Sequence, residues 1–173
     1  DEFFIGLANN YANKSKDQST KLGCVIVDQN KHLVSAGYNG FPVGVNDNIL
    51  ERHERPEKFL YTVHAEANAI AHAAFMGVST QDCILYCRWI PCPNCIGLLK
   101  NAGIVEVVYT DVDTHWEDKF LISREIMLES GILLRKVNEL TFHSFLNSSN
   151  EDYMFQCWNC NEKFYVKAYN RVN

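Results

Sequence analysis

A histidine, a glutamate and two cysteines are spaced in this chain as a reactive metal centre would require. His64 is followed two residues later by Glu66, and Cys92 and Cys95 occur in the later run Pro-Cys-Pro-Asn-Cys. Imidazole nitrogen and thiolate sulfur are preferred zinc ligands, and three protein ligands leave a fourth position at which water can react. A carboxylate that stays off the metal can then move protons. The spacing therefore predicts a catalytic zinc site.

The same ligand types could instead close a structural zinc site. Such a site takes a fourth ligand, for which Cys24, Cys83 and Cys87 are available. A structural site has no need of a glutamate two residues after its histidine, whereas H-x-E followed by P-C-x-x-C is typical of zinc-dependent nucleobase deaminases. The pattern favours an enzyme with Zn²⁺ as cofactor, a hydrolase acting on a cyclic amidine C–N bond.

Two helices are expected to position these residues. The alanine-rich segment 61–76 has apolar residues at helical spacing, including Phe75, and would carry His64 and Glu66 in its first turn. Pro93 suits the first turn of a second helix, which would end at Gly103. The positive ends of both helices would then face the metal and favour thiolates.

The remaining pattern predicts an α/β protein. Residues 1–13 predict a helix, and two short apolar runs predict a β-hairpin. From residue 82 onward the order is strand, helix, strand, helix, strand, which implies parallel strands joined by helical crossovers. The expected fold is a three-layer arrangement: a five-stranded mixed sheet with helices on both faces. Its expected strands are 22–27, 33–37, 83–87, 104–109 and 132–137.

Residues 1–137 are expected to form one deaminase domain, and residues 138–173 a C-terminal appendage. The appendage contains Cys157-Trp158-Asn159-Cys160, whose spacing supplies half of a zinc knuckle. Cys157 and Cys160 could belong to a second zinc site or an interaction element. They could equally be two reduced cysteines of a small hairpin, and the sequence leaves both interpretations open.

Composition restricts the classes of partner. The chain has 173 residues, of which 47% are apolar and 21% charged, as in ordinary globular proteins. The net charge of -5 argues against a strongly basic surface for nucleic acid. No apolar run approaches the roughly 18 residues of a membrane span, and no signal-peptide pattern is visible. Seven cysteines fit a reducing cytoplasm, or the host cytoplasm if the protein is phage-encoded.

With these residues in view, the chain resembles the deoxycytidylate (dCMP) deaminases of the cytidine deaminase superfamily, in particular phage and bacterial members. The resemblance covers residues 1–137. It rests on four motifs: Ser15-Lys16-Asp17 with Thr20, Gly37-Tyr38-Asn39-Gly40, the segment YTVHAEANAI at 61–70, and Pro91 to Cys95. It implies a cytidine-deaminase-like fold and hydrolysis of dCMP to dUMP and ammonia.

The resemblance also implies roles for single residues. It matches the zinc ligands to His64, Cys92 and Cys95, and the proton shuttle to Glu66. It matches the nucleotide contacts to Asn39, Thr20, Trp89 and Lys16. Other interpretations remain for the last two, because tryptophans are common in cores and loop lysines are usually solvated.

Many members of this family are hexamers that dCTP activates and dTTP inhibits. The effector loop in those members corresponds to Gly37, Tyr38, Asn39 and Gly40, so the resemblance implies a homohexamer with nucleotide effectors. Arg88 departs from the Thr, Ser or Ala of relatives near the base. Phe75 stands where several regulated members have Arg.

Other functions remain compatible with the zinc motif. The substrate could be another cytosine nucleotide, such as dCTP, CMP or 5-methyl-dCMP. A tRNA adenosine deaminase shares the motif, although the negative net charge argues against it. A zinc-bearing interaction module is a third alternative, and the presence of Glu66 argues against that one.

Overall fold

The computed structural model describes residues 1–111, 117–137, 153–156 and 163–166. The chain divides into two compact units, Asp1–Glu139 and Leu140–Asn173. The described part of the second unit is an antiparallel hairpin of β6 (Tyr153–Gln156) and β7 (Lys163–Val166). Cys157 and Cys160 lie outside the described residues, so the second zinc site and the role of the appendage stay predictions.

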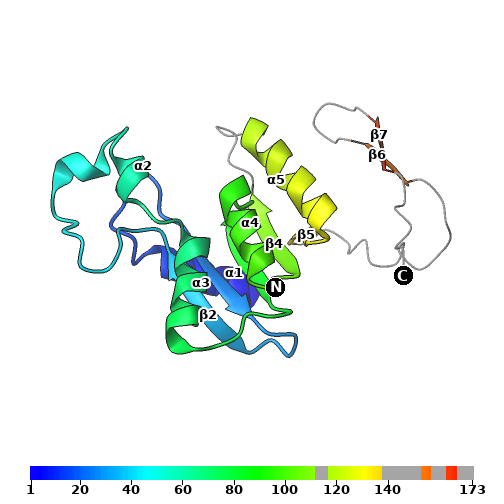
Figure 1. The fold of residues 1–173 in the computed structure, drawn as a ribbon, viewed down its shortest axis with the longest axis horizontal. Helices are drawn as coiled ribbons and strands as arrows, with labels where there is room; N and C mark the ends of the chain where they lie inside the picture. The colour runs from blue at the N-terminus through cyan, green and yellow to red at the C-terminus, as the bar shows by residue number, and fades with distance from the viewer. Residues whose placement is uncertain (112–116, 138–152, 157–162, 167–173) are drawn as a thin grey trace. The chain divides into compact units, whose positions relative to one another are not determined.

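A five-stranded mixed sheet forms the centre of the first unit, in the order β2-β1-β3-β4-β5 (Figure 1). β1 (Gly23–Val27) pairs antiparallel with β2 (Leu33–Tyr38) and with β3 (Ile84–Trp89). β3, β4 (Glu106–Asp111) and β5 (Leu133–Lys136) run parallel. The interior strand β1 is buried at every position, as expected for a strand covered on both faces. The predicted mixed sheet is confirmed.

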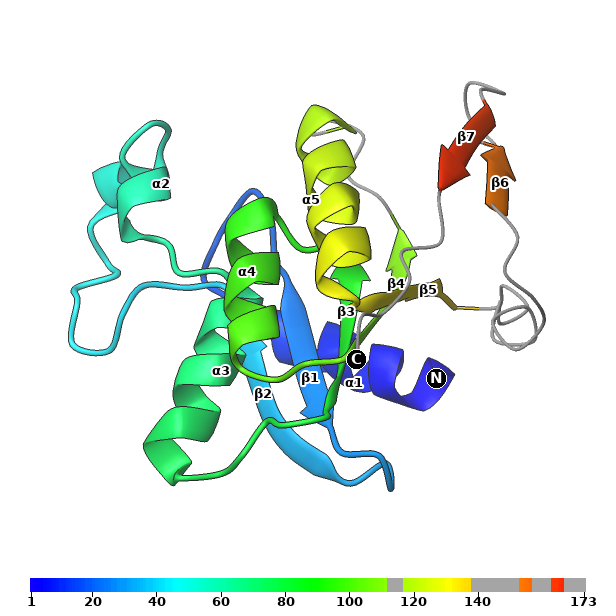
Figure 2. The ribbon, with the colours of Figure 1, turned by 45° about the vertical axis from the view of Figure 1, so that its right-hand side comes forward.

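Helices cover both faces of this sheet (Figure 2). α1 (Glu2–Ala12) packs on β1 and β3 from one side. α3 (Ala65–Met76), α4 (Pro93–Asn101) and α5 (Glu117–Ser130) lie on the other side, and each packs on its neighbour or on the sheet. An apolar cluster fills each of the two interfaces. The predicted three-layer arrangement is therefore confirmed. None of the helices in the described ranges has the length and apolar character that a membrane span needs.

The predicted helix 61–76 is wrong at its start. A separate short helix, α2 (Lys58–Tyr61), ends there, and the chain then runs in extended conformation. α3 begins at Ala65, so His64 is its N-cap residue with an extended backbone, while Glu66 lies in the first turn.

The buried face of α3 also differs from the predicted one. Phe75 is 87% exposed, and the buried residues are Ala65, Glu66, Ala69 and Ala73. An alanine-rich helix has little contrast between its faces, so periodicity identifies the buried face poorly. The close approach of α3 to β2 decides it: a Cβ atom at Gly37 would clash with the backbone of Ala65 and Ala69.

A long excursion of the chain, residues 39–64, separates β2 from α3. It carries η1 (Leu50–His53) and α2 away from the sheet (Figure 2). It closes where Gly40 and Val63 pair, with Gly40 N–H donating to Val63 C=O at 3.1 Å and Val63 N–H donating back at 2.8 Å. His64 follows directly, so the excursion forms a wall beside the metal-ligating residues.

Candidate active site

The structure brings His64, Cys92 and Cys95 together at the N-terminal ends of α3 and α4. Nδ1 of His64 lies 3.5 Å from Sγ of Cys92 and 3.4 Å from Sγ of Cys95. A tetrahedral zinc ion with Zn–N of about 2.0–2.1 Å and Zn–S of about 2.3 Å would separate such atoms by about 3.5 Å. The three side chains therefore fit one zinc ion.

Local sequence explains how two helix ends present these ligands. His64 and Cys92 are both N-cap residues with extended backbones, which directs each side chain past the end of its helix. Pro93 occupies the first turn of α4, where its missing N–H costs nothing. Cys95 lies one turn further on and shares the face of Cys92. Two helix N-termini thus favour negative charge at the ligands.

A fourth cysteine does not complete the set within the part of the chain that the structure describes. Among those residues, His64, Cys92 and Cys95 form the one cluster of at least three His, Cys, Asp or Glu side chains whose ligand atoms lie close enough to share a metal. Cys24, Cys83 and Cys87 are buried free cysteines outside that group. Three protein ligands leave a position for water, as in catalytic zinc sites.

The two ligand sulfurs are electrostatically unequal. Hydrogen bonding to Cys95 lowers the pKa of Cys92 to about 4. The same interaction, together with burial, raises the pKa of Cys95. One sulfur of the pair is therefore readily ionised, and a cation shared by both sulfurs would favour the thiolate form of the other. Metal binding at this pair releases a proton.

Glu66 lies in the first turn of α3 beside the metal-ligating group. Its side chain is buried, and burial raises the pKa of its carboxyl. Burial thereby favours the protonated form of the carboxyl, which helps it to accept a proton as a general acid–base group must. Glu66 can therefore exchange protons with a molecule at the metal.

These residues open into a cavity of about 780 Å³, within the roughly 300–1,000 Å³ of small-molecule sites. Its walls combine hydroxyl and amide groups, aromatic rings and cations. They include Ser19, Thr20, Asn39, Phe59, Trp89, Phe120, Arg55, Lys58 and Lys119. The volume and the mixed lining suit a ligand that has an aromatic base, a sugar and an anionic group.

Three of the four residues matched to nucleotide contacts line this cavity: Thr20, Asn39 and Trp89. Lys16 does not line it. Its side chain is 61% exposed, and Nζ lies 2.8 Å from Oδ1 of Asp47. The structure thus brings the first three to the metal-ligating group and places the lysine elsewhere.

The Asn39 amide is held by the cavity wall. Its Oδ1 accepts a hydrogen bond from the Leu22 N–H at 2.8 Å. Its Nδ2 donates to the Thr20 carbonyl at 2.8 Å and to Oδ2 of Asp17 at 3.3 Å. A bound ligand would meet the second lone pair of Oδ1, because the other groups are already paired.

The same wall contains a buried ion pair that the sequence did not predict. Nζ of Lys58 lies 2.6 Å from Oδ2 of Asp17 and 2.5 Å from Oγ of Ser19. Burial opposes ionisation of Asp17, but hydrogen bonds from Lys58, Thr20 and Ser19 outweigh it and hold the pKa of this carboxyl below its usual range. The pair ties α2 to the loop before β1. The Ser-Lys-Asp motif marked this loop without indicating its partner.

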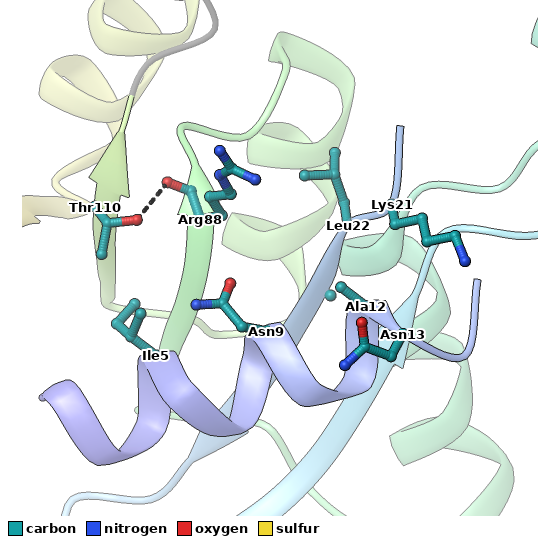
Figure 3. A pocket seen from close by; sticks show the side chains of 9 residues that line it. Ile5, Asn9, Ala12, Asn13, Lys21, Leu22, Arg88 and Thr110 are labelled. Carbon is teal, nitrogen blue, oxygen red and sulfur yellow. Dashed lines mark hydrogen bonds between the residues drawn. The ribbon is translucent and has the colours of Figure 1, made fainter. Parts of the chain in front are cut away.

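Arg88 belongs to the other face of the sheet. It lines a separate cavity of about 380 Å³ beside α1, with Asn9, Asn13 and Lys21 (Figure 3). Thr110 Oγ1 donates to the Arg88 carbonyl at 3.2 Å. Successive strand residues point to opposite faces, so Trp89 lines the larger cavity and Arg88 does not. The Arg88 guanidinium nevertheless lies 5.6 Å from the Trp89 ring, so the departure from relatives at Arg88 adjoins a residue of that wall.

Residues 1–111 match the family model of the cytidine and deoxycytidylate deaminase zinc-binding region. The chain belongs to this family. The human deoxycytidylate deaminase is 33% identical over 140 residues, which cover 78% of each chain. A probable deoxycytidylate deaminase of Caenorhabditis elegans is 40% identical over 111 residues, which cover 62% of this chain and 55% of the worm protein. This chain thus spans about half of the worm relative and more of the human one.

Solved structures of other deaminases share the fold. The dCMP deaminase of the cyanophage S-TIM5, solved in complex with dCMP and dUMP, matches with a TM-score of 0.65 and 24% identity over 79% of this chain and 95% of its own. A diaminohydroxyphosphoribosylaminopyrimidine deaminase/reductase from Thermotoga maritima matches with a TM-score of 0.57 over 78% of this chain. At such identities the likeness shows the fold alone. Because the chain belongs to the cytidine and deoxycytidylate deaminase family and has the three zinc ligands in place, it is a zinc-dependent hydrolytic nucleotide deaminase.

Proposed function

We propose that the chain converts dCMP and water into dUMP and ammonia. The observation that carries this proposal is the buried Glu66 carboxyl beside His64, Cys92 and Cys95 at one side of a nucleotide-sized cavity. The human relative, a deoxycytidylate deaminase, supports dCMP as the substrate.

The chain's own residues supply proton transfer and orientation. Zinc, when bound, lowers the pKa of a water molecule at its open position. Glu66 takes a proton from the attacking water and delivers it to ring nitrogen N3. The water oxygen adds to carbon C4. Glu66 then takes the remaining proton from the new C4 hydroxyl and gives it to the amine, and the C4–N bond breaks to release ammonia and leave the C4 carbonyl of dUMP. Trp89 and Phe120 give the cavity apolar surface for the base, while Thr20 and Asn39 stand where a sugar would lie.

A substrate panel tests this proposal. Ammonia release is measured with dCMP, dCTP, CMP, deoxycytidine and 5-methyl-dCMP, each with and without dCTP or dTTP as effector. We expect the highest kcat/KM for dCMP. A higher value for dCTP or CMP would transfer the proposal to that nucleotide, and zinc-loaded protein that releases ammonia from none of them would favour an interaction module.

We further propose a hexamer that responds to dCTP and dTTP. The effector loop adjoins the metal site, since Gly40 pairs with Val63 and Nδ2 of Asn68 donates to the Tyr38 carbonyl at 2.8 Å. Exposed Phe75 and Met76 at the end of α3 offer apolar surface for contact between copies.

A regulator must bind one conformer more tightly than the other. The curve of activity against dCMP concentration should therefore become more sigmoidal when dTTP is added. Light scattering tests the assembly. The cytoplasmic location stays a prediction.

A further inference from the structure

The cavity contains more positive charge than the proposed deamination itself needs. Among the described residues, three cations line it: Arg55, Lys58 and Lys119. Lys16, which the family resemblance matched to a nucleotide contact, lies outside the lining and pairs with Asp47. Recognition of an anionic group on the substrate must therefore come from another side chain.

Lys119 acts at the metal-ligating end of the cavity. It stands in the first turn of α5, and α5 packs on α4, whose first turn carries the ligand Cys95. Lys119 therefore approaches the cavity from the layer of helices that carries the zinc ligands, where the base of a substrate must lie. A phosphate on the far side of the sugar calls for a cation elsewhere in the cavity.

Lys58 is already paired with other groups of the protein. Its Nζ donates to Oδ2 of Asp17 and to Oγ of Ser19, and the carboxylate neutralises its charge. Its side chain is 10% exposed. Its geometry suits a positioning residue that holds Ser19 and the neighbouring Thr20 against the cavity.

Arg55 has no comparable ion pair with another described residue. It is exposed, it lines the cavity, and it takes part in no ion pair among the residues that the structure describes. The Phe59 ring lies 5.6 Å from its guanidinium and steadies it at the wall. Arg55 also stands three residues before Lys58, whose Nζ donates to Oγ of Ser19, and both Ser19 and Thr20 line the same cavity as Arg55. A guanidinium presents a planar fork of donors that matches two phosphate oxygens.

We propose that Arg55 is the specificity-determining residue that recognises the 5′-phosphate of the nucleotide, with Lys58 positioning the hydroxyl-bearing loop beside it. This inference rests on the proposed function, because it assigns the phosphate end of the same substrate. The site then has two ends: His64, Cys92, Cys95 and Glu66 act on the base, and Arg55 distinguishes a nucleotide from a nucleoside.

The test compares Arg55→Gln with Arg52→Gln. Arg52 is the matched control, because it lies on the same excursion, stacks on Tyr61 at 4.8 Å and does not line the cavity. For each variant, kcat/KM is measured with dCMP and with deoxycytidine, and calorimetry gives the affinities for dUMP and deoxyuridine. A charge-assisted hydrogen bond to phosphate corresponds to a loss of roughly 10- to 100-fold. We expect Arg55→Gln to lose that factor for dCMP and dUMP while the values for the two nucleosides stay unchanged, and Arg52→Gln to match wild type.

Several outcomes would overturn the assignment. Equal losses for nucleotide and nucleoside would show a structural role, and no loss would show that Arg55 is a bystander. The same selective loss in Lys119→Gln, with Arg55→Gln unaffected, would move the phosphate to α5. Failure of the proposed function gives a different result: wild type would not turn over dCMP, yet the preference for dUMP over deoxyuridine would still report on Arg55. A wild type that binds both equally would overturn the proposal on its own.

Discussion

Replacing Glu66 with glutamine is expected to leave zinc and fold in place and to lower kcat for dCMP by at least about 100-fold, the low end for a positioned acid–base group. Glutamine has nearly the same shape but cannot carry a proton between water, ring nitrogen and amine. Because Glu66 lies outside the ligand set, the metal should remain. The measurement is kcat together with zinc content.

Glu125→Gln provides the control, because Glu125 is an exposed glutamate on α5 away from the cavity lining. It should leave kcat unchanged. If Glu66→Gln kept most of the wild-type turnover with a full zinc complement, Glu66 would not be the proton shuttle, and the mechanism above would have to be abandoned.

Replacing Lys58 with methionine is expected to lower the free energy of unfolding by about 3–5 kcal/mol, the usual cost of leaving one partner of a buried pair uncompensated. Asp17 would then be a buried carboxylate without its ammonium, 7% exposed in its side chain. Urea unfolding measures the loss. The double variant Lys58→Met/Asp17→Asn should regain much of it, since no lone charge stays behind.

The ion pair of Lys58 and Asp17 should make the stability of the folded chain fall as the pH is lowered. The pKa of Asp17 is lowered in the folded chain, so its contribution to stability is fully present above the unfolded value of about 3.9. It is lost as the pH falls through the lowered folded value. Wild type should therefore lose stability below about pH 4 more steeply than Asp17→Asn. Parallel acid limbs in the two proteins would mean that the pair stabilises nothing.

The succession of strands along the chain could be read from the sequence because the strands of this sheet have simple signals. β1 and β3 are apolar runs bounded by polar turns. Pro93 indicates the start of α4, and Gly103 indicates its end. The face of α3 could not be read, because alanines fill nearly all of it. Its burial depends on the absence of a side chain at Gly37, a contact between segments far apart in the chain.

The zinc ligands were likewise visible in the sequence, because two short motifs carry them at fixed spacing. The side of the cavity that would bind an anionic group was not visible in the sequence. Lys16 stands in a recognised motif but pairs with Asp47, while Lys58 crosses to Asp17 from an excursion of irregular pattern. Which lysine turns inward depends on how that excursion returns to the sheet at Val63, and local sequence patterns do not encode this return.

Zinc titration into metal-stripped protein tests the central claim most directly. dUMP formation from dCMP is followed as zinc is added back to wild type and to His64→Ala. We expect wild type to be inactive when stripped and to regain activity in proportion to zinc until the site at His64, Cys92 and Cys95 is filled, and His64→Ala to regain none. Stripped protein with undiminished activity, or fully zinc-loaded wild type that forms no dUMP, would contradict the account.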